Sequence, residues 1–181
     1  SGTELKGKKL GIHAFGQVGR NVARIAKGFG MEVFAFDPYC PASVMEAEGV
    51  KPITDINELY STCQYVSLHI PATNETKKSI NYALLKQMPK GAMLINTARK
   101  EVINEEELVQ IMDERPDFRY VSDITPDNAS VFAEKFTGRY FFTPKKMGAQ
   151  TAEANINAGI AAAKQSVGFL KEGIDKFKVN K

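Results

Sequence analysis

The chain has 181 residues, enough for one well-buried core rather than two. Its net charge of +3 comes from interspersed acidic and basic residues, so the basic stripe typical of nucleic-acid binding is not expected, although Lys8-Lys9 and Lys145-Lys146 are local pairs. Cys40 and Cys63 fit neither a metal-ligand spacing nor a disulfide framework, and no apolar run reaches membrane-spanning length, so we expect a cytoplasmic protein without metal, membrane span or signal peptide.

The first predicted element is an apolar strand that leads into a glycine turn and a helix. Residues 10–20 are Leu-Gly-Ile-His-Ala-Phe-Gly-Gln-Val-Gly-Arg. Gly16 and Gly19 lack the side chains that would block a pyrophosphate and the close approach of helix to strand. Ala14 stands where the first of three glycines is usual, which costs the turn some freedom. Phosphates would then bind the N–H groups at the helix start, around Gln17 and Val18.

The second predicted strand, residues 32–36, ends on Asp37, about twenty residues after the glycine turn. The Asp37 carboxylate can accept both ribose hydroxyls of an adenosine, and it would repel a 2′-phosphate, which Pro38 cannot offset. The pattern therefore predicts NAD rather than NADP as cofactor. The simpler interpretation makes Asp37 a turn residue before Pro38.

Strands and helices continue to alternate along the rest of the chain. We expect a short helix at 40–49, a short strand at 51–54, a helix capped by Asp55 with Glu58, a strand at 65–69, a helix at 82–88, a strand at 92–96, a helix capped by Asn104 with Glu107, a strand at 118–122, a helix at 130–136, a strand at 140–142 and a long alanine-rich helix from near Thr151. This alternation predicts an α/β fold, a doubly wound parallel sheet of the Rossmann dinucleotide-binding type, over residues 1–150. A C-terminal helix follows in 151–181.

Such a sheet binds its ligand outside the carboxyl ends of its strands. Polar residues gather at those predicted ends: Gly16, Asp37, His69-Ile70-Pro71, Asn96-Thr97-Ala98-Arg99, Asp123 and Pro144-Lys145-Lys146. This convergence is harder to explain by packing than any single member is. His13 and His69 have a simpler interpretation, a buried imidazole and a structural hydrogen bond respectively.

These motifs together resemble the NAD-binding domain of the D-2-hydroxyacid dehydrogenases, and among them the short-form 3-phosphoglycerate dehydrogenases. The resemblance covers nearly the whole chain: residues 4–8, the glycine turn, 36–39, 68–71, 96–99, Ser122-Asp123 and 145–151. It implies that Arg99 clamps the substrate carboxylate and polarises the oxygen at the reacting carbon, which suits its planar fork. For Arg99 the simpler alternative is a surface salt bridge.

The resemblance also assigns residues to the cofactor. Asp123 would hold the nicotinamide carboxamide, and Thr97 and Ala98 would line the same end. The adenosine half would be flanked by Ile70 and Pro71. From the closing motif, Gly148 and Ala149 are expected at the cofactor site as well.

Two departures from the family pattern concern proton transfer. The family's catalytic histidine is absent; counting from Pro144 puts Lys145 in its place, and counting back from Gly148 puts Lys146 there. An ordinary lysine is protonated near neutral pH, so it suits donation to a developing alkoxide better than proton abstraction. A solvated lysine pair is the simpler interpretation. The glutamate that orients the histidine is replaced by Asn128, with Asp127 beside it as a second candidate.

The predicted function is therefore NAD-dependent oxidation of a phosphorylated 2-hydroxy acid, most plainly 3-phosphoglycerate in the first step of serine synthesis. The alternatives are glyoxylate or hydroxypyruvate reduction, and a non-catalytic NAD-sensing dimerisation module. The resemblance implies a homodimer. It also implies that the N-terminal part of a substrate domain is missing, that residues 151–181 return toward that domain and end like the short form at 177–180, and that the chain alone is an incomplete enzyme.

Overall fold

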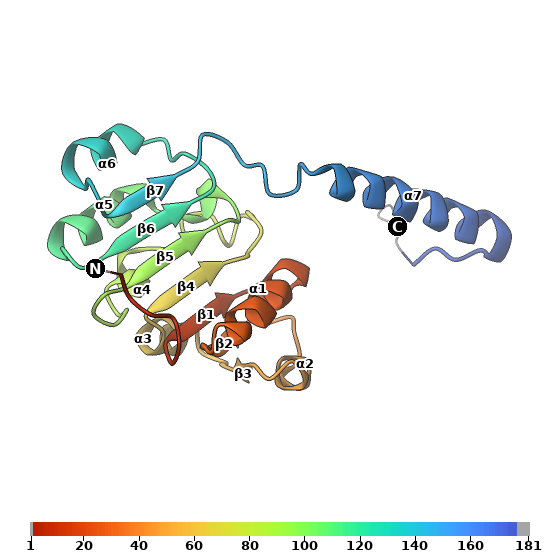
Figure 1. Ribbon diagram of the computed structural model, residues 1–181, viewed down its shortest axis with the longest axis horizontal. Coiled ribbons are helices and arrows are strands. Elements are labelled where there is room, and N and C mark those ends of the chain that lie inside the picture. Colours follow the sequence, from red (N-terminus) through yellow and green to blue (C-terminus); the bar gives the residue numbers. More distant parts are fainter. Residues whose placement is uncertain (1, 177–181) are drawn as a thin grey trace. The chain divides into compact units, whose positions relative to one another are not determined.

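The computed structural model describes residues 2–176, which contain a seven-stranded sheet and a separate long helix (Figure 1). The chain divides into two compact units, Ser1–Lys145 and Lys146–Lys181. The predicted division at residues 150 and 151 remains a prediction. Residues 177–181, part of the predicted return segment, lie outside the described residues, as does Ser1.

The sheet confirms the predicted doubly wound α/β fold, because every pair of neighbouring strands is parallel. Its order is β3-β2-β1-β4-β5-β6-β7. The strands are β1 (Lys9–His13), β2 (Glu32–Phe36), β3 (Lys51–Pro52), β4 (Tyr65–Leu68), β5 (Met93–Asn96), β6 (Arg119–Ser122) and β7 (Tyr140–Phe142). The chain moves outward from β1 to β3 and then returns to place β4 on the other side of β1. Ligands bind at such a switch point.

Helices cover the two faces of the sheet unequally. The helices of the first unit are α1 (Gln17–Gly28), α2 (Ala42–Ala47), α3 (Ile56–Thr62), α4 (Tyr82–Leu85), the 3₁₀ turn η1 (Lys100–Val102), α5 (Glu105–Glu114) and α6 (Ala129–Lys135). One hydrophobic core lies between β1, β2 and the pair α1 and α2, and a larger core lies under α3 to α6 on the other face. Both cores consist mainly of aliphatic and aromatic residues with almost no exposed surface.

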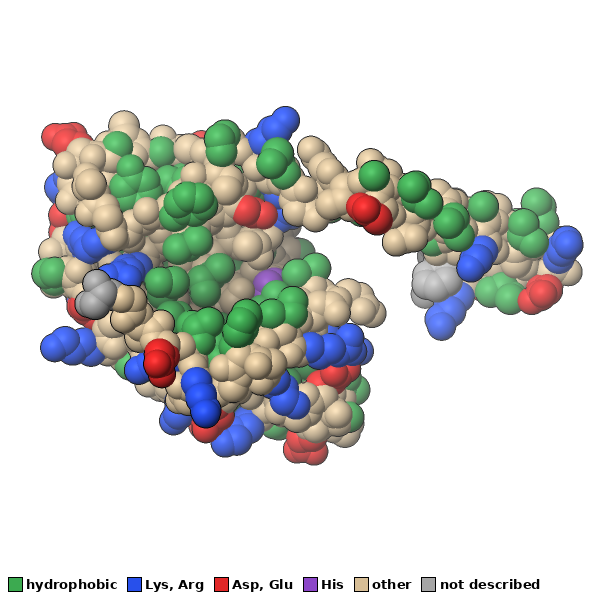
Figure 2. Space-filling view, viewed as in Figure 1, with side chains coloured by type: hydrophobic (Ala, Val, Ile, Leu, Met, Phe, Trp, Pro, Cys, Tyr) green, Lys and Arg blue, Asp and Glu red, His purple; other side chains and the backbone are tan. Residues whose placement is uncertain are grey.

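Part of the face beside α1 keeps apolar side chains at the surface, as Figure 2 shows. There Leu10, Tyr65, Met93 and Ile95 line a groove of about 630 Å³. The sheet therefore has an apolar surface that α1 and α2 leave partly open.

The second unit contains α7 (Ala152–Glu172), which confirms the long helix predicted from near Thr151. The Thr151 hydroxyl accepts the N–H of Ala154 at 3.0 Å and caps the helix, and Gly173 ends it with a φ of 67°. Ile156 and Leu170 are among its exposed apolar side chains. None of the helices in the described residues is both long and apolar enough to cross a membrane.

Candidate active site

The glycine turn after β1 is as tight as the sequence predicts. A Cβ on Gly19 would lie 2.5 Å from the carbonyl oxygen of Ala14 and 3.0 Å from Cγ2 of Ile12, so only glycine fits where α1 meets the turn. Ala14 itself has a φ of 79°, a left-handed conformation that a side chain disfavours. Ala14 therefore carries backbone strain that a glycine in its place would avoid.

The space above the first turn of α1 suits an anion. A Cβ on Gly16 would meet no atom within 4 Å, and Gly16, the N-cap residue, has no side chain to occupy the helix end. The first N–H groups of an α-helix have no acceptor within the helix, and its dipole favours negative charge there. Gln17, Val18 and Gly19 form this turn, so the backbone fits a pyrophosphate.

Asp37 is bound to the glycine turn across the two strands. Its Oδ2 accepts the N–H of Phe15 at 2.8 Å, and its Oδ1 accepts the N–H of Tyr39 at 2.9 Å. The carboxylate therefore shapes its own turn, as the simpler interpretation holds, and also faces the cofactor turn. Each oxygen keeps a second lone pair that can accept a hydroxyl.

A groove of about 750 Å³ brings three predicted residues together, because Asp37, Ile70 and Pro71 all line it. Ala14 and the exposed Tyr39 line it too. Glu75 adds a second carboxylate to the lining. Mainly apolar walls with a few polar groups are typical of sites for small organic ligands. The groove therefore fits the adenosine half of a dinucleotide.

The turn after β5 carries Thr97, Ala98 and Arg99. Asn96 accepts the N–H of Ala98 through Oδ1 and donates to the carbonyl oxygen of Arg99 through Nδ2, both at 3.0 Å. The exposed guanidinium donates to the carbonyl oxygen of Ala98 at 2.8 Å and stays at the surface of the turn. Arg99 is thus available to an incoming carboxylate.

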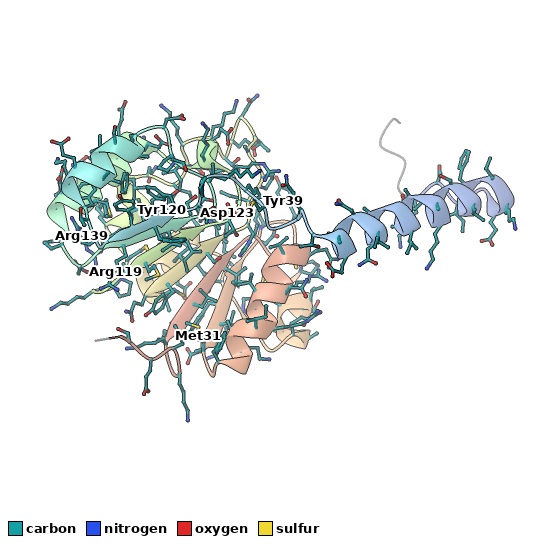
Figure 3. All side chains as sticks on the ribbon, turned by 45° about the horizontal axis from the view of Figure 1, so that its top comes forward. Met31, Tyr39, Arg119, Tyr120, Asp123 and Arg139 are labelled. Atoms are coloured by element: carbon teal, nitrogen blue, oxygen red, sulfur yellow. The ribbon has the colours of Figure 1, made fainter. Side chains whose placement is uncertain are left out.

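Asp123, labelled in Figure 3, follows β6 directly. Its N–H donates to the carbonyl oxygen of Asn96 at 3.2 Å, in line with the register that pairs Asn96 with Ser122. The residues expected at the nicotinamide and at the substrate carboxylate therefore leave neighbouring strands at the same edge.

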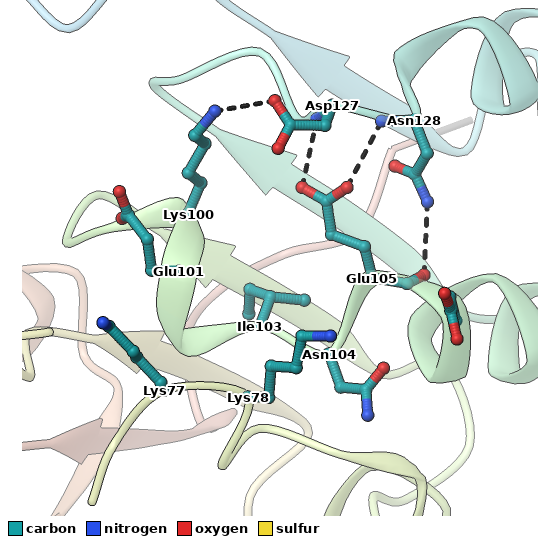
Figure 4. A pocket seen from close by; sticks show the side chains of 10 residues that line it. Lys77, Lys78, Lys100, Glu101, Ile103, Asn104, Glu105, Asp127 and Asn128 are labelled. Carbon is teal, nitrogen blue, oxygen red and sulfur yellow. Dashed lines mark hydrogen bonds and ion pairs between the residues drawn. The ribbon is translucent and has the colours of Figure 1, made fainter. Parts of the chain in front are cut away.

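Asp127 and Asn128 lie in a second pocket, of about 670 Å³ (Figure 4). Asp127 forms an ion pair with Lys100 at 2.6 Å. The Glu105 carboxylate accepts the N–H groups of Asp127 and Asn128 at 3.1 and 3.2 Å, and the Asn128 amide donates to the Glu105 carbonyl oxygen at 3.2 Å. The hydrogen bond and charge of Asp127 raise the pKa of Lys100. These contacts join the loop after β6 to α5, and the predicted catalytic roles of both residues remain predictions.

The two candidate lysines fall on either side of the division between the units. Lys145, which is exposed, is the last residue of the first unit, and its carbonyl oxygen accepts the Thr143 hydroxyl at 3.4 Å. Lys146, Gly148 and Ala149 belong to the second unit. Their place at the site therefore remains a prediction, and so does the choice between the lysines.

The histidines have the structural contacts expected from the sequence. His13 is 9% exposed, and its Nδ1 lies 3.1 Å from the Tyr60 hydroxyl. Burial lowers the pKa of His13 to about 4, although Asp37 acts in the opposite direction. His69 Nε2 bonds with the Ser67 hydroxyl at 2.9 Å. Among residues 2–176, no group of three or more His, Cys, Asp or Glu side chains could hold a metal ion.

The sequence placed Asn96 among the polar residues at the ligand edge but gave it no role, whereas Thr97, Ala98 and Arg99 each received one. The fold, the glycine turn, Asp37 and the turn at Arg99 together define a dinucleotide-binding domain.

Comparison with known proteins identifies the class. The family model for the NAD binding domain of D-isomer specific 2-hydroxyacid dehydrogenases matches residues 1–140. The chain belongs to this family, and its cofactor is NAD.

Individual relatives narrow the comparison. The chain is 38% identical over 185 residues to D-3-phosphoglycerate dehydrogenase 2, chloroplastic, of Arabidopsis thaliana, covering 99% of this chain and 29% of the relative. It is 32% identical over 162 residues to the hydroxypyruvate reductase of Thermotoga maritima, covering 88% and 52%. It also resembles the crystal structure of NAD⁺-bound 3-phosphoglycerate dehydrogenase from Entamoeba histolytica, with a TM-score of 0.88, 48% identity and coverage of 100% and 57%. The chain thus spans only part of each of these proteins.

Proposed function

We propose that this chain is the cofactor half of an NAD-dependent dehydrogenase that oxidises 3-phosphoglycerate reversibly. The observation that carries the proposal is the placement of Arg99 beside Asp123 at one edge of the sheet, with Asp37 and the glycine turn at the same edge. The names of the relatives support the substrate.

The residues divide the work between cofactor and substrate. The α1 N-terminus binds the pyrophosphate, Asp37 accepts the ribose hydroxyls, and Asp123 accepts the carboxamide. When bound, NAD supplies the nicotinamide ring that accepts a hydride from C2 of the hydroxy acid. The remaining assignments concern the substrate. Arg99 holds the carboxylate in a bidentate pair and polarises the C2 oxygen. In oxidation the neutral amine of Lys145 or Lys146 takes the proton of the C2 hydroxyl as the hydride leaves C2, and in reduction the resulting ammonium returns that proton to the C2 oxygen.

Reduction of hydroxypyruvate is the second candidate function. The observation that favours it is the match to the hydroxypyruvate reductase of Thermotoga maritima. Both reactions use the same contacts to a C1 carboxylate and a C2 oxygen, so Arg99 would act alike in both.

The test is steady-state kinetics on the enzyme that contains this domain. The kcat/KM for oxidation of 3-phosphoglycerate at saturating NAD⁺ is compared with the kcat/KM for reduction of hydroxypyruvate at saturating NADH. We expect Arg99→Lys to lower kcat/KM about 100-fold or more, because an ammonium cannot form the bidentate pair, a loss comparable to about 3 kcal/mol. Arg119→Lys, an exposed position on β6, is the control and should leave kcat/KM unchanged. A wild-type enzyme that prefers hydroxypyruvate contradicts the proposed substrate, and unchanged turnover in Arg99→Lys contradicts the proposed site.

The expected homodimer and cytoplasmic location belong to the same proposal. The partly open apolar groove beside α1 supports association, because its apolar lining is left partly uncovered in a single chain. Sedimentation equilibrium tests the dimer: a single species with the mass of one chain at micromolar concentration would contradict it.

A further inference from the structure

Buried polar side chains of the described sheet gather at its carboxyl edge. They are His13 in β1, Ser67 in β4, Asn96 in β5 and Ser122 in β6. Asn96 and Ser122 each accept an N–H from two residues further along, Ala98 at 3.0 Å and Ile124 at 3.2 Å. A buried polar group is costly unless it is hydrogen-bonded, so these bonds fix the turns in which the chain leaves the sheet.

The Asn96 side chain binds, from the buried side, the turn after β5 that carries Arg99. The Asn96 side chain is 1% exposed, so it reaches neither solvent nor a ligand. Besides Ala98 it binds the carbonyl oxygen of Arg99, and its Nδ2 also donates to the Tyr120 hydroxyl at 3.4 Å. One buried amide therefore fixes two peptide groups of this turn, one on each side of the peptide that joins Ala98 to Arg99.

The Tyr120 hydroxyl connects this turn to the next one. Tyr120, labelled in Figure 3, is 2% exposed. It lies two positions before Ser122 in β6, so the two side chains share a face of the strand. Burial raises the pKa of Tyr120, against the effect of its hydrogen bonds with Asn96 and Ser122, so the hydroxyl stays protonated. Its ring is held by Phe132 and Phe142, with centroids 6.0 and 5.5 Å away. The hydroxyl can accept from Asn96 while donating to Ser122.

We propose that Asn96 and the Tyr120 hydroxyl form a buried positioning layer that orients Arg99 toward the substrate and Asp123 toward the nicotinamide. The proposal rests on the proposed function, since it assigns a role relative to those two residues. Asn96 and Tyr120 are positioning residues, because both are buried beneath the turns. The layer couples the turns after β5 and β6 through a single hydroxyl, so weakening it affects both.

The test compares Asn96→Ala and Tyr120→Phe with the wild-type enzyme, using Tyr140→Phe as the matched control. Tyr140 lies in the same aromatic cluster, on β7. We expect kcat/KM for 3-phosphoglycerate to fall about 10- to 100-fold in Asn96→Ala and about 3- to 10-fold in Tyr120→Phe, because small displacements of a positioning group have large kinetic effects. The Kd for NADH, measured by fluorescence titration, should stay within about 3-fold of wild type, since the pyrophosphate and ribose contacts are unchanged. A purely structural role would move both quantities together.

Hydrogen exchange supplies a second measurement that does not depend on turnover. The amides of Ala98 and Ile124 should exchange faster in Tyr120→Phe than in Tyr140→Phe. If Asn96→Ala fails to fold, Tyr120→Phe still decides the matter, because it removes a single oxygen. If Tyr120→Phe has the kcat/KM of the wild type, the proposed positioning role is wrong, while the proposed function is unaffected. A wild-type enzyme that neither binds NADH nor oxidises the hydroxy acid overturns the proposed function, and this proposal with it.

Discussion

At the residue scale, His13 makes the stability of the protein depend on pH. It ends β1 in a nearly buried position beside Tyr60, and burial lowers its pKa to about 4 in the folded protein. In an unfolded chain a histidine has a pKa of about 6.5. The unfolded state therefore binds more protons between these two values.

This difference predicts a pH-dependent loss of stability. The free energy of unfolding should decline as the pH falls from about 6.5 to about 4, by roughly 2 to 4 kcal/mol in total, and the effect should level off below that range. Urea unfolding at a series of pH values measures it. In His13→Asn, which keeps a polar group near Tyr60, this part of the decline should vanish. Parallel pH profiles for both proteins would show that His13 is not the group responsible.

At the element scale, α5 contacts both the loop after β6, through Glu105, and α4, through Glu107. The Asn104 side chain caps α5 by accepting the N–H of Glu107 at 3.3 Å. The predicted cap is therefore confirmed. The Asn104 N–H itself donates to the carbonyl oxygen of Ile80 at 2.9 Å. The Glu107 carboxylate instead accepts the N–H of Tyr82 at 2.7 Å and joins α5 to α4.

The Glu107 contact is testable with a neighbouring control. Glu107→Ala removes the acceptor of a partly buried N–H, so it should lower the free energy of unfolding by about 1 to 3 kcal/mol. Glu106→Ala removes the same charge from the same first turn of α5, at a position that is exposed, and should cost less than about 0.5 kcal/mol. Urea denaturation of both variants measures the difference. Equal losses would mean that the helix dipole, rather than the Tyr82 bond, explains the effect.

The sequence predicted those features whose cause is local. The glycine turn and the succession of strands and helices along the chain follow from residue spacing, and they agree with the structure. The helix predicted over 82–88 ends at Leu85, because the N–H groups of Gln87 and Met88 bond to carbonyl oxygens three residues back instead of four. The positioning layer could not be predicted from the sequence. It depends on the pairing of β5 with β6, which brings the Tyr120 hydroxyl within 3.4 Å of the Asn96 amide.

At the scale of the whole molecule, the seven-stranded sheet collects the proposed site from distant parts of the chain. The ends of β1, β2, β5 and β6 supply the glycine turn, Asp37, Arg99 and Asp123 in one unit. The predicted proton-transfer residue lies where the first unit ends, at Lys145 or Lys146. The cofactor contacts can therefore be measured on this chain by itself, separately from proton transfer.

The most direct measurement is the affinity of the chain for NADH and NADPH, by fluorescence titration of wild type and Asp37→Asn. Because the Asp37 carboxylate lies against the glycine turn, NADH should bind at least about tenfold more tightly than NADPH, a difference of about 1.4 kcal/mol. Asp37→Asn should narrow that ratio by removing the repulsion of the 2′-phosphate. Equal affinity for both dinucleotides in the wild type, or a ratio that Asp37→Asn leaves unchanged, would contradict the proposed site.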